Sequence, residues 1–333
     1  MKALVTGGLG FIGFHLTNLL LREGVEVFSI DNINSYYDPS LKKAKLPLLG
    51  IQEPLKDDDT TIYSASGLAY RFARIDITNR EQIENLLHRE QFDVIFHLAA
   101  QAGVQYSLQN PHTYVSTNLV GFINLLDAAR QSNVGQFVYA SSSSVYGDRE
   151  DVPFSEEDRV DQPISIYAAT KKANELMAFS YSHLYQLKTT GLRFFTVYGP
   201  WGRPDMAPYL FMKKMIEGDT IEVFNEGKLE RDFTYVDDIV KGIYQVCKQK
   251  TLAEVYNIGN SNPVNLNDFI ATMEEVLGVK AKIAYRPMRI GDVYRTYSDV
   301  SKLRRDFGYQ PSIGIREGLA RMAEWYKGYY QLK

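Results

Sequence analysis

Short apolar runs alternate with amphipathic stretches along the first 200 residues of the chain. A strand buried on both faces of a sheet is apolar throughout, whereas a helix that covers a sheet is apolar along one side only. The alternation therefore predicts a doubly wound, parallel α/β sheet. We expect strands at 2–6, 26–31, 70–75, 94–98, 136–140 and 189–195, and helices at 11–23, 80–90, 113–132 and 166–187.

A glycine-rich turn joins the first expected strand to the first expected helix. It contains Gly7, Gly10, Phe11, Ile12 and Gly13. The glycines allow the backbone to turn tightly and to approach a pyrophosphate, which would lie at the helix N-terminus. Glycines 7, 10 and 13 match one known glycine spacing, and glycines 8, 10 and 13 match another. The spacing alone therefore does not decide the subfamily.

An acidic residue, Asp31, ends the second expected strand. A carboxylate there accepts hydrogen bonds from the adenosine ribose hydroxyls and repels a 2′-phosphate, which favours NAD over NADP as the cofactor. A second carboxylate, Asp76, follows the third expected strand and is expected at the adenine. The other residues expected around the cofactor are Asn32, Ile77, Leu98, Ala99, Ala100 and Asn118.

Tyr167 and Lys171 are four residues apart in an expected helix, and a run of four serines, 141–144, precedes them. Residues at i and i+4 share one face of a helix, so the phenol and the ammonium can point the same way. A free phenol has a pKa of about 10, and a nearby cation favours the phenolate. Such a pair, with a serine hydroxyl in reach, is suited to deprotonating an alcohol as a hydride leaves its carbon.

The alternation loosens after residue 200, which indicates a smaller C-terminal lobe. We expect a cofactor-binding domain at 1–198, to which 233–260 returns, and a substrate-binding lobe at 199–232 and 261–333. Within the returning part, 233–248 and 255–258 are expected to rejoin the main sheet. Segment 39–69, with three consecutive aspartates at 57–59, has no clear period and is expected to be a surface excursion near the cofactor or a partner chain.

The composition excludes several classes of protein. A net charge of −3 and a pI near 6.0 give no general attraction to nucleic acid or to an anionic membrane. No apolar run is long enough to span a bilayer, and the strand expected at 2–6 leaves no room for a signal peptide, so we expect a cytoplasmic protein. The single cysteine, Cys247, and His97 are expected in the core, and no metal site is expected.

Several segments together resemble the extended short-chain dehydrogenase/reductase family, over nearly the whole chain. They include Thr6-Gly-Gly-Leu-Gly-Phe-Ile-Gly13, Ser141-Ser-Ser-Ser-Val-Tyr-Gly147 and Arg193-Phe-Phe-Thr-Val-Tyr-Gly-Pro200, with 97–100, 167–171, 231–238 and 257–259. The resemblance implies a Rossmann sheet and nucleotide-sugar chemistry. It also implies that Tyr167 is the acid/base, that Lys171 holds the nicotinamide ribose and lowers the pKa of the tyrosine, and that Ser142 is the catalytic serine.

The serine run also departs from part of that family. Members that eliminate water carry an Asp-Glu pair just before Val-Tyr-Gly, and related decarboxylases carry a Glu there, which supplies their extra acid/base chemistry. Ser143 and Ser144 stand at these positions here. The resemblance therefore implies reversible oxidation at one carbon, as a sugar 4-epimerase requires.

The sugar is indicated by segment 196–207, which resembles that of the UDP-glucuronate 4-epimerases. The resemblance assigns Ser143, Thr196 and Arg203 to the sugar carboxylate, which needs a cation and hydroxyl donors. UDP-glucose 4-epimerases have an Asn where Thr196 stands. Arg231 and Arg289 match family arginines that bind the diphosphate, and Asp292 lies in the associated turn.

The resulting expectation is an NAD-dependent epimerase that converts UDP-glucuronate to UDP-galacturonate through a 4-keto intermediate. Two alternatives remain open: an epimerase or reductase acting on UDP-glucose, UDP-N-acetylglucosamine or a nucleotide pentose, and a non-catalytic NAD-binding regulator. The family resemblance further implies a homodimer, in which helices 113–132 and 166–187 would pair.

Overall fold

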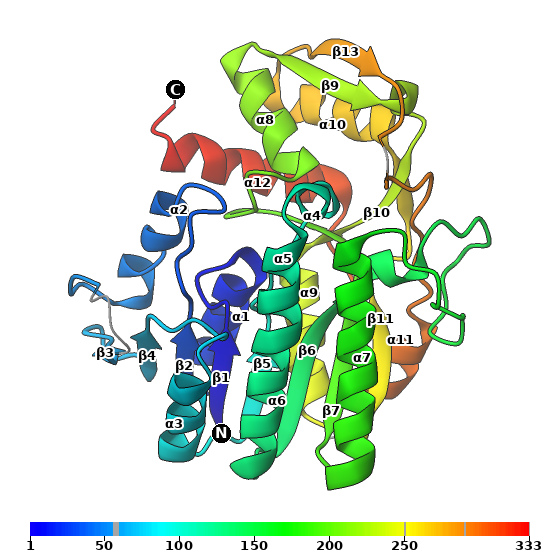
Figure 1. Ribbon diagram of the computed structural model, residues 1–333. Coiled ribbons are helices and arrows are strands. Elements are labelled where there is room, and N and C mark those ends of the chain that lie inside the picture. The colour runs from blue at the N-terminus through cyan, green and yellow to red at the C-terminus, as the bar shows by residue number, and fades with distance from the viewer. Residues whose placement is uncertain (56–59, 250, 290, 333) are drawn as a thin grey trace. The chain divides into compact units, whose positions relative to one another are not determined.

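The computed structural model describes residues 1–55, 60–249, 251–289 and 291–332, and its chain divides into two compact units (Figure 1). Unit 1 comprises Met1–Gly147, Arg159–Arg193 and Val240–Tyr256, and unit 2 comprises Asp148–Asp158, Phe194–Ile239 and Asn257–Lys333. The chain thus leaves unit 1 and re-enters it twice. The sequence did not indicate that 148–158 belongs with the C-terminal lobe, because these residues lie between two elements of the main sheet.

Unit 1 is built on a sheet with strand order β11-β7-β6-β5-β1-β2-β4-β3. The strands β4, β2, β1, β5 and β6 are parallel to one another, and the short β3 is antiparallel to β4. The bounds are β1 Lys2–Thr6, β2 Glu26–Ile30, β3 Ile62–Tyr63, β4 Tyr70–Ala73, β5 Val94–His97, β6 Gln136–Ser142, β7 Thr189–Phe194 and β11 Glu254–Ile258. The predicted doubly wound α/β fold is confirmed, and so is the return of 255–258 to the main sheet.

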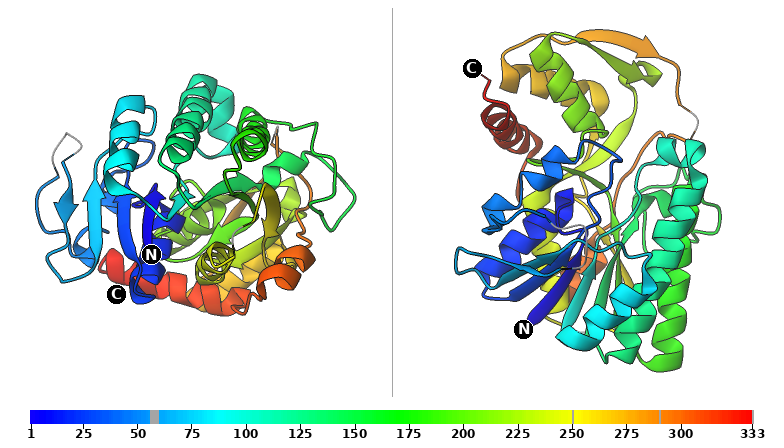
Figure 2. Two further views of the ribbon diagram at one scale, coloured as in Figure 1. Left: turned by 90° about the horizontal axis from the view of Figure 1, so that it is seen from below. Right: turned by 60° about the vertical axis from the view of Figure 1, so that its left-hand side comes forward.

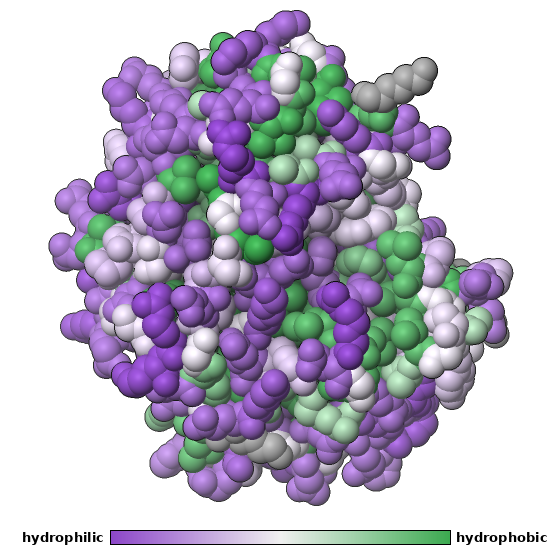
Figure 3. All heavy atoms as spheres, turned by 180° about the vertical axis from the view of Figure 1, so that it is seen from behind, coloured by the Kyte–Doolittle hydropathy of each residue, from purple (hydrophilic) through white to green (hydrophobic). Residues whose placement is uncertain are grey.

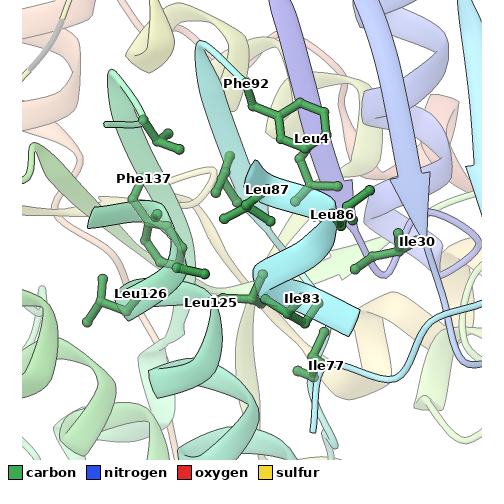
Figure 4. Packing of buried hydrophobic residues seen from close by; sticks show 14 of the residues in the cluster. Leu4, Ile30, Ile77, Ile83, Leu86, Leu87, Phe92, Leu125, Leu126 and Phe137 are labelled. Atoms are coloured by element: carbon green, nitrogen blue, oxygen red, sulfur yellow. The ribbon is translucent and has the colours of Figure 1, made fainter. Parts of the chain in front are cut away.

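Helices cover both faces of this sheet (Figure 2). On one face lie α3 (Arg80–Glu90), α6 (Gly121–Gln131) and α7 (Ile166–Tyr185), and on the other lie α1 (Phe11–Arg22) and α9 (Val236–Cys247). The apolar sides of α3 and α6 pack on the central strands, where every residue of the cluster is at least nine-tenths buried. Figure 4 shows this packing around Leu4, Ile83, Leu87, Leu125 and Phe137.

The helix expected at 113–132 is divided in the structure. It consists of α5 (Pro111–Tyr114), a π-helical turn η2 (Val115–Val120) and α6, and the short α4 (Val104–Gln109) precedes it. The apolar period of the sequence continues through all three pieces, so the period does not reveal the π-helical turn. The turn contains Asn118, which is buried.

The segment expected to be an irregular excursion is partly ordered. It contains α2 (Ser40–Lys43), the 3₁₀ turn η1 (Pro47–Leu49) and β3, and its apolar residues Leu41, Leu46, Leu49 and Ile51 are buried. The three aspartates expected on it, 57–59, lie outside the described residues.

Unit 2 contains two small sheets, β12-β10-β8 and β13-β9. Their strands are β8 Thr196–Tyr198, β9 Thr220–Phe224, β10 Glu230–Tyr235, β12 Pro263–Asn265 and β13 Lys282–Arg286. The helical elements are α8 (Ala207–Glu217), α10 (Leu266–Leu277), α11 (Ser301–Phe307), α12 (Ile315–Tyr329) and the turn η4 (Asn225–Gly227). Residues 233–235 therefore do not rejoin the main sheet as expected, because β10 pairs with β8 and β12 instead.

The distribution of hydrophilic and hydrophobic side chains is that of an ordinary globular protein. Hydrophilic side chains predominate over the face shown in Figure 3, with smaller groups of hydrophobic ones between them. Cys247 is buried, as predicted, and burial raises the pKa of its thiol to about 11. Within the described residues, no helix is both long enough and apolar enough to cross a membrane.

Candidate functional site

Most of the predicted cofactor and catalytic residues follow neighbouring strands of the main sheet. The carboxyl ends of parallel strands lie at one edge of a sheet, which is where ligands bind in doubly wound folds. In sheet order, Ser142 ends β6, Leu98–Ala100 follow β5, the glycine turn follows β1, Asp31 and Asn32 follow β2, and Asp76 and Ile77 follow β4. The sequence positions are scattered, and the sheet topology brings them to one edge.

The glycine turn has no room for side chains. Gly7 has a φ of +69°, and a Cβ there would lie 2.9 Å from the amide nitrogen of Ala99. A Cβ at Gly10 would lie 2.9 Å from the carbonyl oxygen of Gly7, and one at Gly13 would overlap that same oxygen. Gly10 is the N-cap of α1 and has no side chain to satisfy the first N–H groups of the helix. This cradle fits a dinucleotide pyrophosphate.

Two lysines from segment 39–69 reach this edge, and sequence reasoning did not assign them. The carboxylate of Asp31 accepts a hydrogen bond from the backbone N–H of Ile33 at 2.8 Å and pairs with the Lys42 ammonium at 3.0 Å. The Lys45 ammonium donates to the carbonyl oxygens of Leu9 at 2.9 Å and Gly10 at 3.3 Å. The segment was expected near the cofactor or near a partner chain. These contacts place part of it beside the glycine turn.

The next predicted residues form two hydrogen-bonded groups. The Asn32 amide donates to Asp76 at 2.8 Å. Burial raises the pKa of Asp76, but the hydrogen bonds from Asn32 and Thr78 outweigh it and hold the pKa below its usual value. Asn118 accepts from the backbone N–H of Gln101 at 2.9 Å and donates to the Gln101 carbonyl and to Thr170. Asn118 thus ties the segment after β5 to the helix that carries Lys171.

Tyr167 and Lys171 lie one turn apart near the start of α7, as predicted. The side chain of Ser165 caps this helix by accepting from the backbone N–H of Ala168 at 3.1 Å. The Tyr167 ring is half-buried and meets the ring of buried Tyr114 edge-on at a centroid distance of 6.1 Å. The Lys171 ammonium donates to the carbonyl oxygen of Ala140 at 2.7 Å, and burial lowers the pKa of this lysine to about 8.

The serine run lies at the turn between β6 and η3 (Ser143–Tyr146). Ser142 is buried, and its hydroxyl accepts from the backbone N–H of Ser144 at 3.1 Å. Ser143 and Ser144 are half-buried and belong to η3 itself. The positions beside Ser142 are therefore occupied by neutral hydroxyl groups.

A buried ion pair holds α7 against the main sheet, and sequence reasoning missed its function. Both side chains, Glu175 of α7 and Arg193 of β7, are 4% exposed. Two guanidinium nitrogens of Arg193 donate to the carboxylate, each at 2.9 Å, and a third donates to the hydroxyl of Tyr146 at 2.9 Å. Ser141 also donates to Glu175, at 2.6 Å. Because Glu175 lies two turns from Tyr167 on the same helix face, this network fixes the helix that carries Tyr167 and Lys171.

Unit 2 carries the residue assigned to the sugar carboxylate, Arg203. Its guanidinium forms two hydrogen bonds to the Asp205 carboxylate, with Nε to Oδ1 at 3.0 Å and an Nη to Oδ2 at 2.5 Å. Trp201, two residues earlier, packs on α12. The centroid of its ring lies 5.2 Å from that of Trp325 and 5.0 Å from that of Tyr329. The loop is thus anchored by aromatic contacts, and its arginine already holds a carboxylate in the two-point geometry typical of this pair.

The three residues assigned to the diphosphate also lie in unit 2. Burial lowers the pKa of Arg231, opposed by the charge of Asp292. Burial raises the pKa of Asp292 in spite of the charges of Arg231 and Arg289. The Arg289 guanidinium stacks on the Phe224 ring at 3.6 Å from its centroid. The positive charges of two arginines therefore both favour the ionised form of Asp292. Thr196, the other residue of unit 2 assigned to the sugar carboxylate, begins β8.

A further titratable residue of the main sheet is His97, which ends β5. His97 is buried and its Nδ1 is 2.8 Å from the hydroxyl of Thr6, which confirms the predicted core histidine. Burial, and to a lesser extent the charge of Lys171, lowers the pKa of His97 to about 3, so the ring is neutral. Among the described residues, no group of three or more His, Cys, Asp and Glu is placed to hold a metal ion.

Comparison with known proteins agrees with this geometry. A family model described as GDP-mannose 4,6 dehydratase matches residues 4–322. The chain belongs to this family. It is 44% identical to UDP-glucuronate 4-epimerase 3 of Arabidopsis thaliana over 347 aligned positions, gaps included, and the match covers 99% of this chain and 77% of the relative. These matches place the chain in the nucleotide-sugar epimerase branch of the extended short-chain dehydrogenases/reductases.

Solved structures give the same placement. The fold is similar to that of the UDP-glucuronic acid 4-epimerase from Bacillus cereus in complex with UDP-glucuronic acid and NAD, with a TM-score of 0.89, 32% identity, and coverage of 99% of this chain and 100% of that one. It is also similar to the UDP-glucose 4-epimerase of Thermotoga maritima with UDP-glucose, with a TM-score of 0.86, 28% identity, and coverage of 99% and 100%.

Proposed function

We propose that this protein is an NAD-dependent epimerase that inverts C4 of UDP-glucuronate to give UDP-galacturonate. The observation that carries the choice of sugar is the Arg203 guanidinium. It forms a two-point contact with the carboxylate of Asp205, on a loop that Trp201 anchors. The similarity to UDP-glucuronate 4-epimerases over almost the whole chain supports the same choice.

The reaction needs a hydride acceptor that is restored in each turnover. NAD, held at the glycine cradle and at Asp31, supplies this chemistry when bound. The cation of Lys171 favours the phenolate of Tyr167, which takes the proton of the C4 hydroxyl as hydride leaves C4. The 4-keto sugar then turns about its diphosphate and presents its other face. Hydride returns to C4, and Tyr167 gives the proton back to the oxygen, so the carbinol is inverted.

The carboxylate of the sugar must survive this intermediate. A 4-keto uronate is a β-keto acid and can lose carbon dioxide. We propose that Arg203, Thr196 and Ser143 bind the carboxylate, the arginine as a cation and the other two as neutral hydroxyl groups. Since Ser143 and Ser144 replace the carboxylic acids of the related lyases, the two positions after Ser142 supply no general acid for elimination or decarboxylation.

The remaining proposed roles follow from the charges described above. Arg231 and Arg289 bind the diphosphate, and Asp292 orients the two arginines in the absence of substrate. Leu98, Ala99, Ala100, Asn32, Asp76 and Ile77 line the dinucleotide along the carboxyl edge of the main sheet.

We also propose a homodimer through α6 and α7, which lie side by side (Figure 1). The face of α7 exposes Leu176, Phe179 and Leu184, at 57%, 60% and 65% of their surface, and η2 exposes Val115 and Val120. Large exposed apolar residues gathered on neighbouring helices are typical of a protein interface. A second copy of the same helices offers a matching surface.

The proposal is tested by incubating the protein with UDP-glucuronate without added NAD and separating the sugars released by hydrolysis. Formation of galacturonate supports it, whereas activity confined to UDP-glucose or UDP-N-acetylglucosamine would replace the substrate, and no activity on any of them would favour a regulator. A variant, Arg203→Gln, tests the carboxylate site. We expect its KM to rise about 10-fold or more for UDP-glucuronate, because one charge-assisted contact is lost, and little for UDP-glucose. Equal losses for both sugars would contradict the assignment.

A further inference from the structure

The segment between β2 and β4 delivers a fully buried lysine to the cofactor-binding turn. Lys45 is 0% exposed and is among the largest fully buried side chains of the described residues. It lies two residues after the end of α2, and the buried side chains of Leu41, Leu46 and Leu49 fix the segment on both sides of it. The position of the ammonium is therefore set by packing.

Lys45 donates to the last two residues before α1, Leu9 and Gly10. Its ammonium donates to the carbonyl oxygens of Leu9 and Gly10 at 2.9 and 3.3 Å and lies 5.7 Å from the centroid of the Phe14 ring. Gly10 is the N-cap of α1, so these carbonyls fix the direction in which the first N–H groups of the helix point. The contact spans 36 positions in the sequence and joins the turn to a separate element.

A charge at this place also has an electrostatic effect. The N-terminus of a helix carries only about half an elementary charge, whereas an ammonium carries a whole one. The buried surroundings screen it less than water would. Burial lowers the pKa of Lys45 to about 7; the charge of Asp31 opposes this effect and the charge of Lys42 adds to it. An anionic pyrophosphate at the turn would favour the charged lysine.

We propose that Lys45 is a positioning residue for NAD: it fixes the glycine turn through the carbonyls of Leu9 and Gly10 and supplies a buried positive charge that retains the dinucleotide pyrophosphate. Segment 39–69 is thus part of the cofactor site. This inference concerns the cofactor and does not depend on which sugar the protein epimerises.

The test compares two methionine variants of the same segment. Lys45→Met removes the buried ammonium, and the matched control Lys43→Met removes an exposed one two residues away, with the same change in net charge. NAD released from each purified protein by acid is measured per chain, and its dissociation rate is followed by exchange with labelled NAD. We expect NAD to be held about 10- to 100-fold more weakly by Lys45→Met, the effect of one charge-assisted contact, and unchanged by Lys43→Met.

Two further measurements separate positioning from a general loss of structure. Lys45→Arg keeps a charged donor and should retain most of the NAD, and UDP affinity, measured by titration calorimetry, should stay within about twofold in all variants, because the residues proposed for the diphosphate belong to unit 2. The proposal is wrong if Lys45→Met retains NAD as Lys43→Met does, if Lys45→Arg loses NAD to the same extent as Lys45→Met, or if NAD and UDP affinity fall together.

Discussion

The ion pair between Glu175 and Arg193 offers a sharp test of how the catalytic helix is held. The substitution Glu175→Gln keeps the shape of the side chain and removes its charge. Arg193, whose side chain is 4% exposed, would then be a buried cation without its carboxylate. Breaking a buried pair in this way costs about 3–5 kcal/mol. A chain of 150–250 residues loses about 2–4 °C in Tm per kcal/mol, and a longer one less, so we expect a decrease on the order of 5–10 °C.

The assay is thermal unfolding followed by circular dichroism, with Glu84→Gln as the matched control. Glu84 pairs with Arg80 at 2.6 Å on the surface, with side chains 35% and 69% exposed, and such a pair contributes about 0–1 kcal/mol. The double variant Glu175→Gln, Arg193→Met should recover part of the stability because the lone buried cation is gone. If Glu175→Gln unfolds within about 1 °C of the parent, as the control should, the reasoning is refuted.

The same pair has a defined pH dependence. Burial raises the pKa of Glu175, but the hydrogen bonds and charge of Arg193 outweigh it, so that the pKa in the folded protein is below the ordinary 4.5. The unfolded chain then binds more protons than the folded one in the acid range. The stability advantage over Glu175→Gln is therefore complete above pH 4.5 and is lost as the pH falls through the lowered pKa.

Two further outcomes follow from the structure. Burial lowers the pKa of Lys171 to about 8, so the cation proposed to assist Tyr167 is lost above that pH and kcat/KM should fall with an apparent pKa near 8. Lys171→Arg should abolish this alkaline limb while lowering the maximal rate, whereas a limb that persists in the variant would assign it to another group. The substitution Phe179→Glu on the exposed face of α7 should convert a dimer to a monomer in sedimentation velocity, while Leu68→Glu, at another exposed apolar position of unit 1, should not; an unchanged mass for Phe179→Glu would place the interface elsewhere.

The parts of the site that the sequence predicts are those encoded by neighbouring residues. The glycine turn, Asp31 and the pair Tyr167 and Lys171 are short patterns, each attached to one element, and the topology of a parallel sheet brings the strand ends to one edge. Helix α3 begins and ends as its apolar period predicts, and its N-cap Asn79 accepts from the backbone N–H of Gln82. Such features need no knowledge of distant contacts.

Contacts between distant segments could not be predicted in this way. Glu175 stands at an ordinary polar position of a helix, and its partner Arg193 comes from another element, so only the folded chain shows that both are buried. The sequence nevertheless contains one sign of this ion pair. Arg193 interrupts an otherwise apolar strand, and a charge inside such a strand requires a partner. The sequence contains no such sign for Lys45, because segment 39–69 has no apolar period that would predict which of its residues are buried.

The buried lysines link these observations. Among the described residues, the buried lysines are Lys42, Lys45 and Lys171, and all of them lie at the carboxyl edge of the main sheet. Lysine is among the residues least often buried, because its charged form loses the solvation that water provides. Burial lowers the pKa of both Lys45 and Lys171, which shows that the folded protein bears this cost at both positions. Departures from the usual burial rules gather at functional sites. The clustering of three such departures at one edge therefore argues that they serve the dinucleotide rather than the stability of the fold.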